Sequence, residues 1–405
     1  MENKRVPEVR FEGFSGEWEE RKLGEVAEFN PKSKIPENFE YVDLESVVGT
    51  NLISHRMEQK ETAPSRAQRL AKQGDVFYQM VRPYQKNNYL FDLPYDNYVF
   101  STGYAQMRPY VDSYFLLNRL QEERFVSNVL DRCTGTSYPA INSNDLAQIE
   151  INVPISKEEQ TDIGDFFKQL DDMIALHQQE LTTLKQTKQG FLQKMFPKEG
   201  ESVPEVRFPG FTGDWEQRKL KDLLESAYQG INTAGDKVEY SDSGVKVLQS
   251  KHITSGTISF DDARYLDKDR YSEYFPKYVP DVDDILFANI GTIGPSAVVT
   301  DSKEFLVAWN ILKMKPSNEA NSRFIQLQLQ RLKSQRYFEK VTTGNATKFV
   351  NKDEILGTQI VVPEKKEQSK IGDLFAHLDH LIALHQREVD ALKETKKAFL
   401  QKMFV

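Results

Sequence analysis

Two stretches of the chain repeat hydrophobic residues every three or four positions, the spacing of one long helix face. They run from Glu159 to Phe196 and from Glu367 to Phe404, and 24 of their 38 positions are identical. Their seam positions correspond throughout: Ile163, Phe167, Leu170, Ile174, His177, Leu181, Leu184, Lys188, Phe191 and Met195 in the first, and Ile371, Phe375, Leu378, Ile382, His385, Val389, Leu392, Lys396, Phe399 and Met403 in the second. A helix of this length extends about 57 Å. Each stripe needs an apolar partner, and the simplest partner is the other copy in an antiparallel coiled coil.

The polar seam residues predict a register. Lys188 and Lys396 occupy the same place in the two copies, as polar residues that set register in coiled coils do. If the two helices pair centre to centre, Lys188 comes close to Asp379 and Lys396 to Asp171.

A second repeat precedes each helix. Residues 6–23 and 203–220 are identical at 14 of 18 positions, whereas the inserts 24–157 and 221–365 share only scattered residues. Short apolar or alternating runs at 74–78 and 283–287, and at 149–154 and 358–363, predict strands within those inserts. We call residues 6–23 and 203–220 the repeated frame. Trp18 and Trp215 belong to it, so we interpret them as core anchors.

These patterns predict an α/β (α+β) protein with two pseudo-symmetric globular domains joined by two long antiparallel helices. The expected boundaries are 1–157 for the first frame and domain, 158–202 for the first helix and its link, 203–366 for the second frame and domain, and 367–405 for the second helix. Near-identical frames around divergent inserts are typical of one scaffold that presents two different binding domains.

Composition limits the setting. The chain of 405 residues has a single cysteine, Cys133, which excludes an internal disulfide and a thiolate metal cluster. No apolar run is long enough for a membrane span, and the first residues do not resemble a signal peptide, so we expect a cytoplasmic protein without a membrane partner. A net charge of −8 disfavours unaided coating of nucleic acid, so any such role must rest on local patches or on a basic partner.

Motifs for catalysis are missing. The sequence has no Pro-Pro dipeptide, as an adenine methyltransferase signature requires, and no Gly-rich loop of the ATP-binding or dinucleotide-binding type. We therefore expect no catalytic residue and no cofactor in this chain. His377 and His380 lie one helical turn apart, but a zinc site needs further ligands and none is nearby in the sequence, so we expect no metal. His177 and His385 recur at seam positions, which favours a structural role or a partner contact.

The order of these elements resembles the specificity subunit of type I restriction–modification systems. The resemblance rests on the frame around Trp18 or Trp215, the strand ending at Pro154 or Pro363, the Glu-Gln pair at 159–160 or 367–368, and the helix ending in FLQKMF. It implies that each insert is a target-recognition domain reading one half of a bipartite double-stranded DNA site. It also implies that the helices set the spacing and hold two adenine-N6 methyltransferase subunits, that two motor-nuclease subunits complete the restriction enzyme, and that this subunit is not catalytic.

Polar and basic loops next to the predicted strands are the candidates for contact with DNA, because guanidinium and amide groups match base edges and phosphates. Gly-rich polar loops at 134–138 and 342–348 precede a predicted strand in both copies. The candidate DNA-binding residues are Arg66, Arg69, Arg82, Tyr84, Lys86, Thr136, Ser137 and Tyr138 in the first insert, and Lys251, Asn289, Thr292, Thr347 and Lys348 in the second.

Two other classes remain open on the sequence. A self-sufficient nuclease or methylase is disfavoured by the missing motifs. A coiled-coil scaffold without DNA readout is compatible with the acidic balance, although the divergent, loop-rich inserts argue against it.

Overall fold

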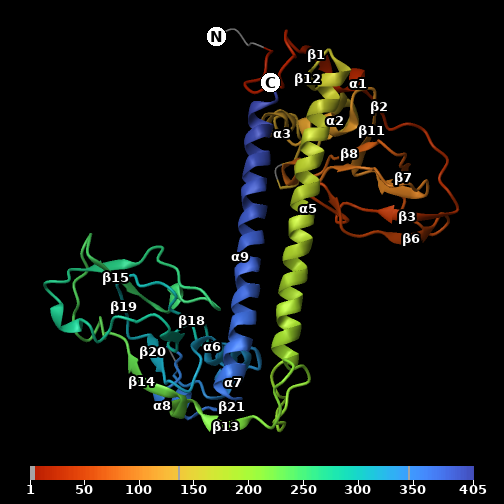
Figure 1. The fold of residues 1–405 in the computed structure, drawn as a ribbon. Helices are drawn as coiled ribbons and strands as arrows, with labels where there is room; N and C mark the ends of the chain where they lie inside the picture. The colour runs from red at the N-terminus through yellow and green to blue at the C-terminus, as the bar shows by residue number, and fades with distance from the viewer. Residues whose placement is uncertain (1–4, 136, 345–346) are drawn as a thin grey trace. The chain divides into compact units, whose positions relative to one another are not determined.

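The computed structural model describes residues 5–135, 137–344 and 347–405. The chain forms two compact units: unit 1 comprises residues 1–179 and 386–405, and unit 2 comprises residues 180–385. Each unit contains one insert and a part of each long helix (Figure 1). The boundaries expected from the sequence separate each insert from a whole helix. The two compact units are divided differently, because each unit includes a part of both helices.

The long helices are α5 (Lys157–Lys194) and α9 (Lys365–Lys402), each of 38 residues. Both begin and end two residues earlier than the sequence pattern predicts. Met195 and Met403 therefore lie beyond the helix ends, where they and the following Phe196 and Phe404 are buried in the cores of unit 2 and unit 1. The final seam position is a core anchor rather than a helical residue.

Within unit 1, the first part of α5 packs antiparallel against the last part of α9. Phe166 contacts Phe399 with ring centroids 4.9 Å apart, Asp171 accepts from Lys396 at 2.7 Å, and His177 lies 3.2 Å from Glu388. As the residue number rises on α5 it falls on α9, which defines the direction. The predicted Lys396–Asp171 pair is confirmed.

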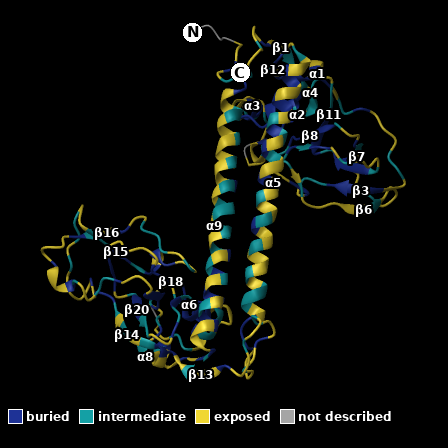
Figure 2. Cartoon of the chain, viewed as in Figure 1, coloured by how far each residue is buried: buried dark blue, intermediate teal, exposed yellow. Residues whose placement is uncertain are grey.

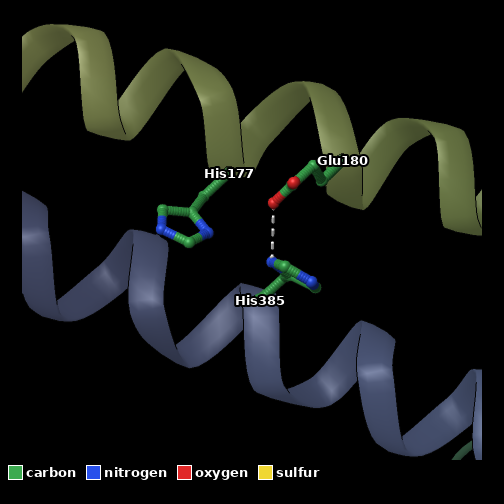
Figure 3. A group of neighbouring side chains, drawn as sticks. All are labelled: His177, Glu180 and His385. Atoms are coloured by element: carbon green, nitrogen blue, oxygen red, sulfur yellow. Dashed lines mark ion pairs between the residues drawn. The ribbon is translucent and has the colours of Figure 1, made fainter.

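Unit 2 repeats this arrangement with the roles of the helices exchanged. Lys188 of α5 forms an ion pair with Asp379 of α9, which confirms the second predicted pair. Glu180 and His385 form the matching ion pair at 3.2 Å, with the carboxylate and the imidazole pointing toward one another (Figure 3). Within each unit, a seam histidine thus joins the two helices through a glutamate of the other helix.

Unit 1 builds its insert from small sheets and short helices. Alternating and apolar runs form the strands, and the central strand β8 is buried on both faces (Figure 2). The strands are β1 (Glu19–Lys22), β2 (Ala27–Phe29), β3 (Asn38–Val42), β4 (Val47–Val48), β5 (Asn51–Leu52), β6 (Arg56–Gln59), β7 (Ala67–Leu70), β8 (Val76–Gln79), β9 (Tyr89–Leu90), β10 (Tyr98–Ser101), β11 (Tyr104–Pro109) and β12 (Glu150–Val153). The helices are α1 (Leu23–Val26), η1 (Pro83–Gln85), α2 (Ser113–Arg119), α3 (Glu123–Leu130) and α4 (Ser143–Ala147).

Unit 2 has the corresponding elements. Its strands are β13 (Glu216–Lys219), β14 (Leu224–Gln229), β15 (Val245–Leu248), β16 (Arg264–Leu266), β17 (Ile285–Ala288), β18 (Ser296–Val298), β19 (Phe305–Val307), β20 (Ile311–Pro316) and β21 (Gln359–Val362). Its helices are η2 (Leu220–Leu223), η3 (Ser250–His252), η4 (Ser272–Tyr274), α6 (Ser322–Ser334), α7 (Tyr337–Lys340) and α8 (Lys352–Gly357).

Sheet topology shows that the two inserts share a fold despite their divergent sequences. The order β2-β11-β8-β9 in unit 1 matches β14-β20-β17-β18 in unit 2, and β1-β12 matches β13-β21. Each unit also pairs two strands in parallel, β3 with β10 in unit 1 and β15 with β19 in unit 2. The predicted α/β (α+β) class, with two related domains and two long helices, is confirmed.

The repeated frame anchors each insert to its helix through a buried ion pair. Glu159 accepts from Arg10 at 2.7 Å and from the Trp18 indole at 3.2 Å, and Trp18 is only 1% exposed. In unit 2, Glu367 accepts from Arg207 at 2.7 Å, and Trp215 is 3% exposed. Both tryptophans are core anchors, as the sequence predicts.

The glutamine of the repeated Glu-Gln pair positions the next helix of the insert. Gln160 donates to the Pro154 carbonyl at 2.8 Å and accepts from the Asp112 amide at 3.2 Å, and the Asp112 carboxylate caps α2. In unit 2, Gln368 makes the same two bonds, to Pro363 and to Asn321, the cap of α6. These bonds fix the geometry of each insert on its helix.

Across the residues that the structure describes, no helix combines the length and the apolar character that crossing a bilayer requires.

Candidate nucleic-acid interface

Most of the predicted loops of unit 1 meet at one end of its central sheet. Val81 pairs with Ala140, Met80 donates to the Gly103 carbonyl at 3.0 Å, and Thr102 donates to the Arg66 carbonyl at 2.8 Å. Segments far apart in the sequence are therefore joined by backbone hydrogen bonds. We call residues 66–69, 80–88, 101–103, 134–135 and 137–140 the unit 1 loop cluster.

Arg82 and Tyr138 form the centre of this cluster. Arg82 has a φ of 54°, its amide bonds to the Pro139 carbonyl at 2.8 Å, and its guanidinium lies 4.5 Å from the Tyr138 ring centroid. The Tyr138 side chain is 63% exposed, so an aromatic face and a cation are presented together to solvent. Such a pair can contact both bases and phosphates.

The other predicted residues of unit 1 differ in their surroundings. Arg66, Tyr84 and Ser137 are exposed. Lys86 forms an ion pair with Glu123 at 2.7 Å. Arg69 is half-buried on β7, and burial lowers the pKa of its guanidinium. Thr136 lies outside the described residues.

Unit 2 brings its predicted loops together around a network of amides. Asn289 donates to the Val350 carbonyl at 3.1 Å and exchanges bonds with Gln229, whose amide lies 2.9 Å from the Asn289 oxygen. Asn310 accepts from the Ser250 amide at 3.1 Å, and its carbonyl accepts from the Asn289 amide at 3.3 Å. These bonds tie together residues 228–235, 249–254, 289–294, 308–310, 343–344 and 347–352, which we call the unit 2 loop cluster.

Four predicted residues of unit 2 are exposed on this cluster: Lys251, Thr292, Thr347 and Lys348. Gly291 donates to the Lys348 carbonyl at 2.8 Å, which places the two polar loops side by side. Asn289 differs, because it is 2% exposed and its amide is used within the protein. Its position supports a role in holding the loops, while the exposed neighbours are free to face a ligand.

Charge distinguishes both clusters from the rest of the chain. The sequence contains 61 acidic residues in 405, yet neither cluster has an Asp or a Glu. The unit 1 loop cluster carries Arg66, Arg69, Arg82 and Lys86, of which Lys86 is paired with Glu123 outside the cluster. The unit 2 loop cluster carries Lys251, Lys348 and Lys352. Each cluster is thus a local patch of cationic residues in a protein whose net charge is −8. Such a patch can attract a polyanion.

His252 does not add to this charge. It is buried, and its Nδ1 accepts a hydrogen bond from the Gln249 amide at 2.8 Å. Burial and the neighbouring Lys251 lower the pKa of its imidazole, so the neutral form is favoured.

The sequence did not single out Trp309, which follows β19 in the unit 2 loop cluster and is 38% exposed. One signal was available, because Trp309 is the one tryptophan outside the repeated frames. Its exposure depends on the tight turn between β19 and β20, which the spacing of polar residues does not reveal.

Two parts of the chain match the same protein family. The family model described as the type I restriction modification DNA specificity domain matches residues 15–186 and 212–394. The two matches coincide with the two repeats, and together they cover most of the chain.

Curated relatives match over a shorter region. A chain of Methanocaldococcus jannaschii, provisionally named the type I restriction enzyme MjaX specificity subunit, is 28% identical over 201 residues, which is 47% of this chain and 45% of the relative. The type I restriction enzyme HindI specificity subunit of Haemophilus influenzae is 26% identical over 194 residues, 44% of this chain and 41% of the relative. The chain thus spans less than half the length of these two relatives.

Solved structures share the fold over nearly the full length. The S subunit of a type I restriction–modification system from M. genitalium is 14% identical, with a TM-score of 0.68 and 99% of each chain covered. A chain from a study of complex assembly and conformational transition of a type I restriction–modification system is 20% identical, with a TM-score of 0.51 and coverage of 95% of this chain and 97% of that one. At these identities the likeness concerns the fold.

Proposed function

Because this chain belongs to the type I restriction–modification DNA specificity family, we propose that it is the non-catalytic subunit that selects the DNA site of such an enzyme. Each unit reads one half of a bipartite, asymmetric site. The observation that carries the proposal is the pair of acid-free, cationic loop clusters at equivalent places in an otherwise acidic protein.

The two clusters occupy the same place in the shared fold but expose different side chains. Unit 1 offers Arg82 stacked on Tyr138, whereas unit 2 offers Thr292, Thr347 and Lys348. Shared backbone geometry fixes how each unit approaches the duplex, and the differing side chains contact different bases. The half-sites read by the two units therefore differ in sequence.

Partners supply the chemistry. We propose that two adenine-N6 methyltransferase subunits bind the paired helices and that two motor-nuclease subunits complete the restriction enzyme. In this assembly α5 and α9 set the number of base pairs between the half-sites. The exposed, charged outer faces of the helices are available for such contacts.

A footprinting experiment tests the proposal. The chain, the methyltransferase subunits encoded with it, and their mixture are each incubated with fragmented host DNA, and protected sequences are read out. We expect protection only with the mixture, at sites that share two short motifs and a fixed gap, because the chain alone is net acidic. Protection by the methyltransferase alone at the same sites, or none with any mixture, would contradict it.

Charge-reversed variants sharpen this test. Lys348→Glu removes an exposed cation from the unit 2 loop cluster and should weaken protection and reduce its salt dependence. Lys221→Glu changes an exposed lysine of η2 outside the cluster and serves as the matched control. Equal losses in both variants would indicate a general charge effect rather than an interface.

A further inference from the structure

Trp309 stands out among the tryptophans of this chain. Trp18 and Trp215 are 1% and 3% exposed, whereas Trp309 is 38% exposed. Burying the exposed part of this indole against an apolar group is favourable, so the side chain can contribute to the binding of a ligand.

The backbone of Trp309 is held in place. Its amide donates to the Ile231 carbonyl at 2.7 Å, and its carbonyl accepts from the Gln229 side chain. The next residue, Asn310, is bonded to Ser250 and Asn289 as part of the amide network. The indole is thus presented from a fixed turn, and little conformational entropy is lost when it contacts a ligand.

The surroundings of Trp309 suit nucleic acid better than a protein. It belongs to the acid-free unit 2 loop cluster, which carries Lys251, Lys348 and Lys352. Tyr228 precedes Gln229, whose side chain bonds to the Trp309 carbonyl. Tyr228 is 43% exposed and has the Lys352 ammonium 6.0 Å from its ring centroid. Exposed aromatics among cations and hydroxyls provide apolar contacts to bases together with phosphate contacts.

Unit 1 has a different residue at the same place. The strand pairings align β10 and β11 with β19 and β20, so that Thr102 of unit 1 corresponds to Trp309. Thr102 is half-buried and donates its amide to the Arg66 carbonyl. The two amides bond to different segments, Arg66 before β7 in unit 1 and Ile231 after β14 in unit 2, so the turn is shared while its surroundings and its side chain differ. A side chain that differs at a shared turn can contribute to a difference in the sequence that each unit reads.

We propose that Trp309 is a specificity-determining residue of unit 2, whose indole packs against base edges of the DNA half-site read by that unit. The thymine methyl group in the major groove is the apolar base feature that it fits. This proposal rests on the proposed function, since it assigns a residue within the same interface.

Fluorescence of a labelled chain tests this proposal. The chain is produced with 5-hydroxytryptophan, whose fluorescence can be excited selectively in the presence of ordinary tryptophan. The labelled chain is then combined with unlabelled methyltransferase subunits. Accessibility to acrylamide is measured for the chain, for the complex, and for the complex with duplex DNA carrying the footprinted site. A Trp309→Phe chain, labelled in the same way, identifies the exposed signal, because the other two tryptophans are buried.

We expect an acrylamide-quenched component in the chain and in the complex that becomes protected when DNA is added. Protection by the methyltransferase alone would show that Trp309 docks a protein and would overturn the proposal. DNA binding detected by anisotropy without protection would overturn it too, while leaving the proposed function intact. Failure of the complex to bind any DNA would instead remove the proposed function and this proposal with it.

Sequence preference provides the second readout. Trp309→Ala should weaken binding of the footprinted site about tenfold and relax base preference in one half-site only. Trp309→Phe keeps an aromatic contact and should retain most of the preference. Lys221→Ala, at an exposed position outside both loop clusters, is the control and should leave both half-sites unchanged. An unchanged site in Trp309→Ala would contradict a role in specificity.

Discussion

Single residues of the repeated frame join each insert to its helix. Glu159 is almost fully buried and binds both Arg10 and Trp18. Neutralising one member of a buried ion pair leaves the other charge uncompensated, which is more costly than removing a surface pair.

We therefore expect Glu159→Gln to lower the free energy of unfolding of unit 1 by about 3 kcal/mol. Glu158→Gln, one residue earlier and exposed, should change it by less than about 0.5 kcal/mol. Urea denaturation of the full chain measures both. Similar losses in the two variants would show that the Arg10–Glu159 pair has no special role.

His252 gives unit 2 a dependence on pH. Its pKa in the folded state lies below the ordinary value of 6.5, so the folded state binds fewer protons than the unfolded state. Its neutral form therefore contributes stability that is present above about pH 6.5 and lost as the pH falls toward the folded-state pKa.

Thermal unfolding between pH 7 and pH 5 should reveal this loss. We expect the stability of His252→Gln to fall less steeply than that of the unchanged chain, because its amide oxygen can accept the Gln249 hydrogen bond without titrating. His377→Gln, at an exposed position of α9, should follow the unchanged chain. A parallel pH profile for all three proteins would refute the role of His252.

At the scale of elements, glycine shows where a helix approaches the insert. A Cβ on Gly164 of α5 would lie 2.3 Å from Asp112 Oδ1, the cap of α2. Gly190 of the same helix has open space around it. The first glycine is required by packing, and the second is not.

Gly164→Ala should destabilise unit 1 by about 1–3 kcal/mol through overpacking. Gly190→Ala should instead stabilise its helix by up to about 1 kcal/mol, because alanine has the higher helix propensity. Calorimetry of the two single variants compares them directly. Stabilisation by both would mean that α2 does not rest on α5 as described.

The elements also show what the sequence could reveal. The seam of α5 and α9 and the Lys188–Asp379 pair were predictable, because helical spacing and repetition leave few alternatives. The role of Gln160 was not, since its partners are a carbonyl and a cap brought near by folding.

The interface was predictable only in part. Polar loops such as that of Tyr138 have a recognisable composition, but the burial of Asn289 and the exposure of Trp309 depend on long-range turns. Hydrogen bonds between distant segments decide which side chain faces outward. Local sequence does not carry that information.

At the scale of the whole molecule, duplication predicts self-association of half the chain. Unit 1 includes the end of α9 and the residues that follow it, and Phe399, Met403 and Phe404 recur in the first repeat as Phe191, Met195 and Phe196. A second copy of residues 1–200 can therefore provide the core residues that the end of the second repeat provides to unit 1 in the full chain. We expect this fragment to form a dimer in analytical ultracentrifugation, and Phe196→Glu to weaken it. A folded monomer at micromolar concentrations would contradict the exchange of helix ends.

The central claim is that each unit reads its own half-site. Single-molecule sequencing of methylated adenines tests it in cells that lack other adenine methylation and express the chain with its methyltransferase. The unchanged chain is compared with one whose residues 24–154 are replaced by the matching insert of a relative. We predict a bipartite motif in both, with one half changed by the replacement and the other half retained. A motif without two parts, or a replacement that alters both halves, would contradict the account.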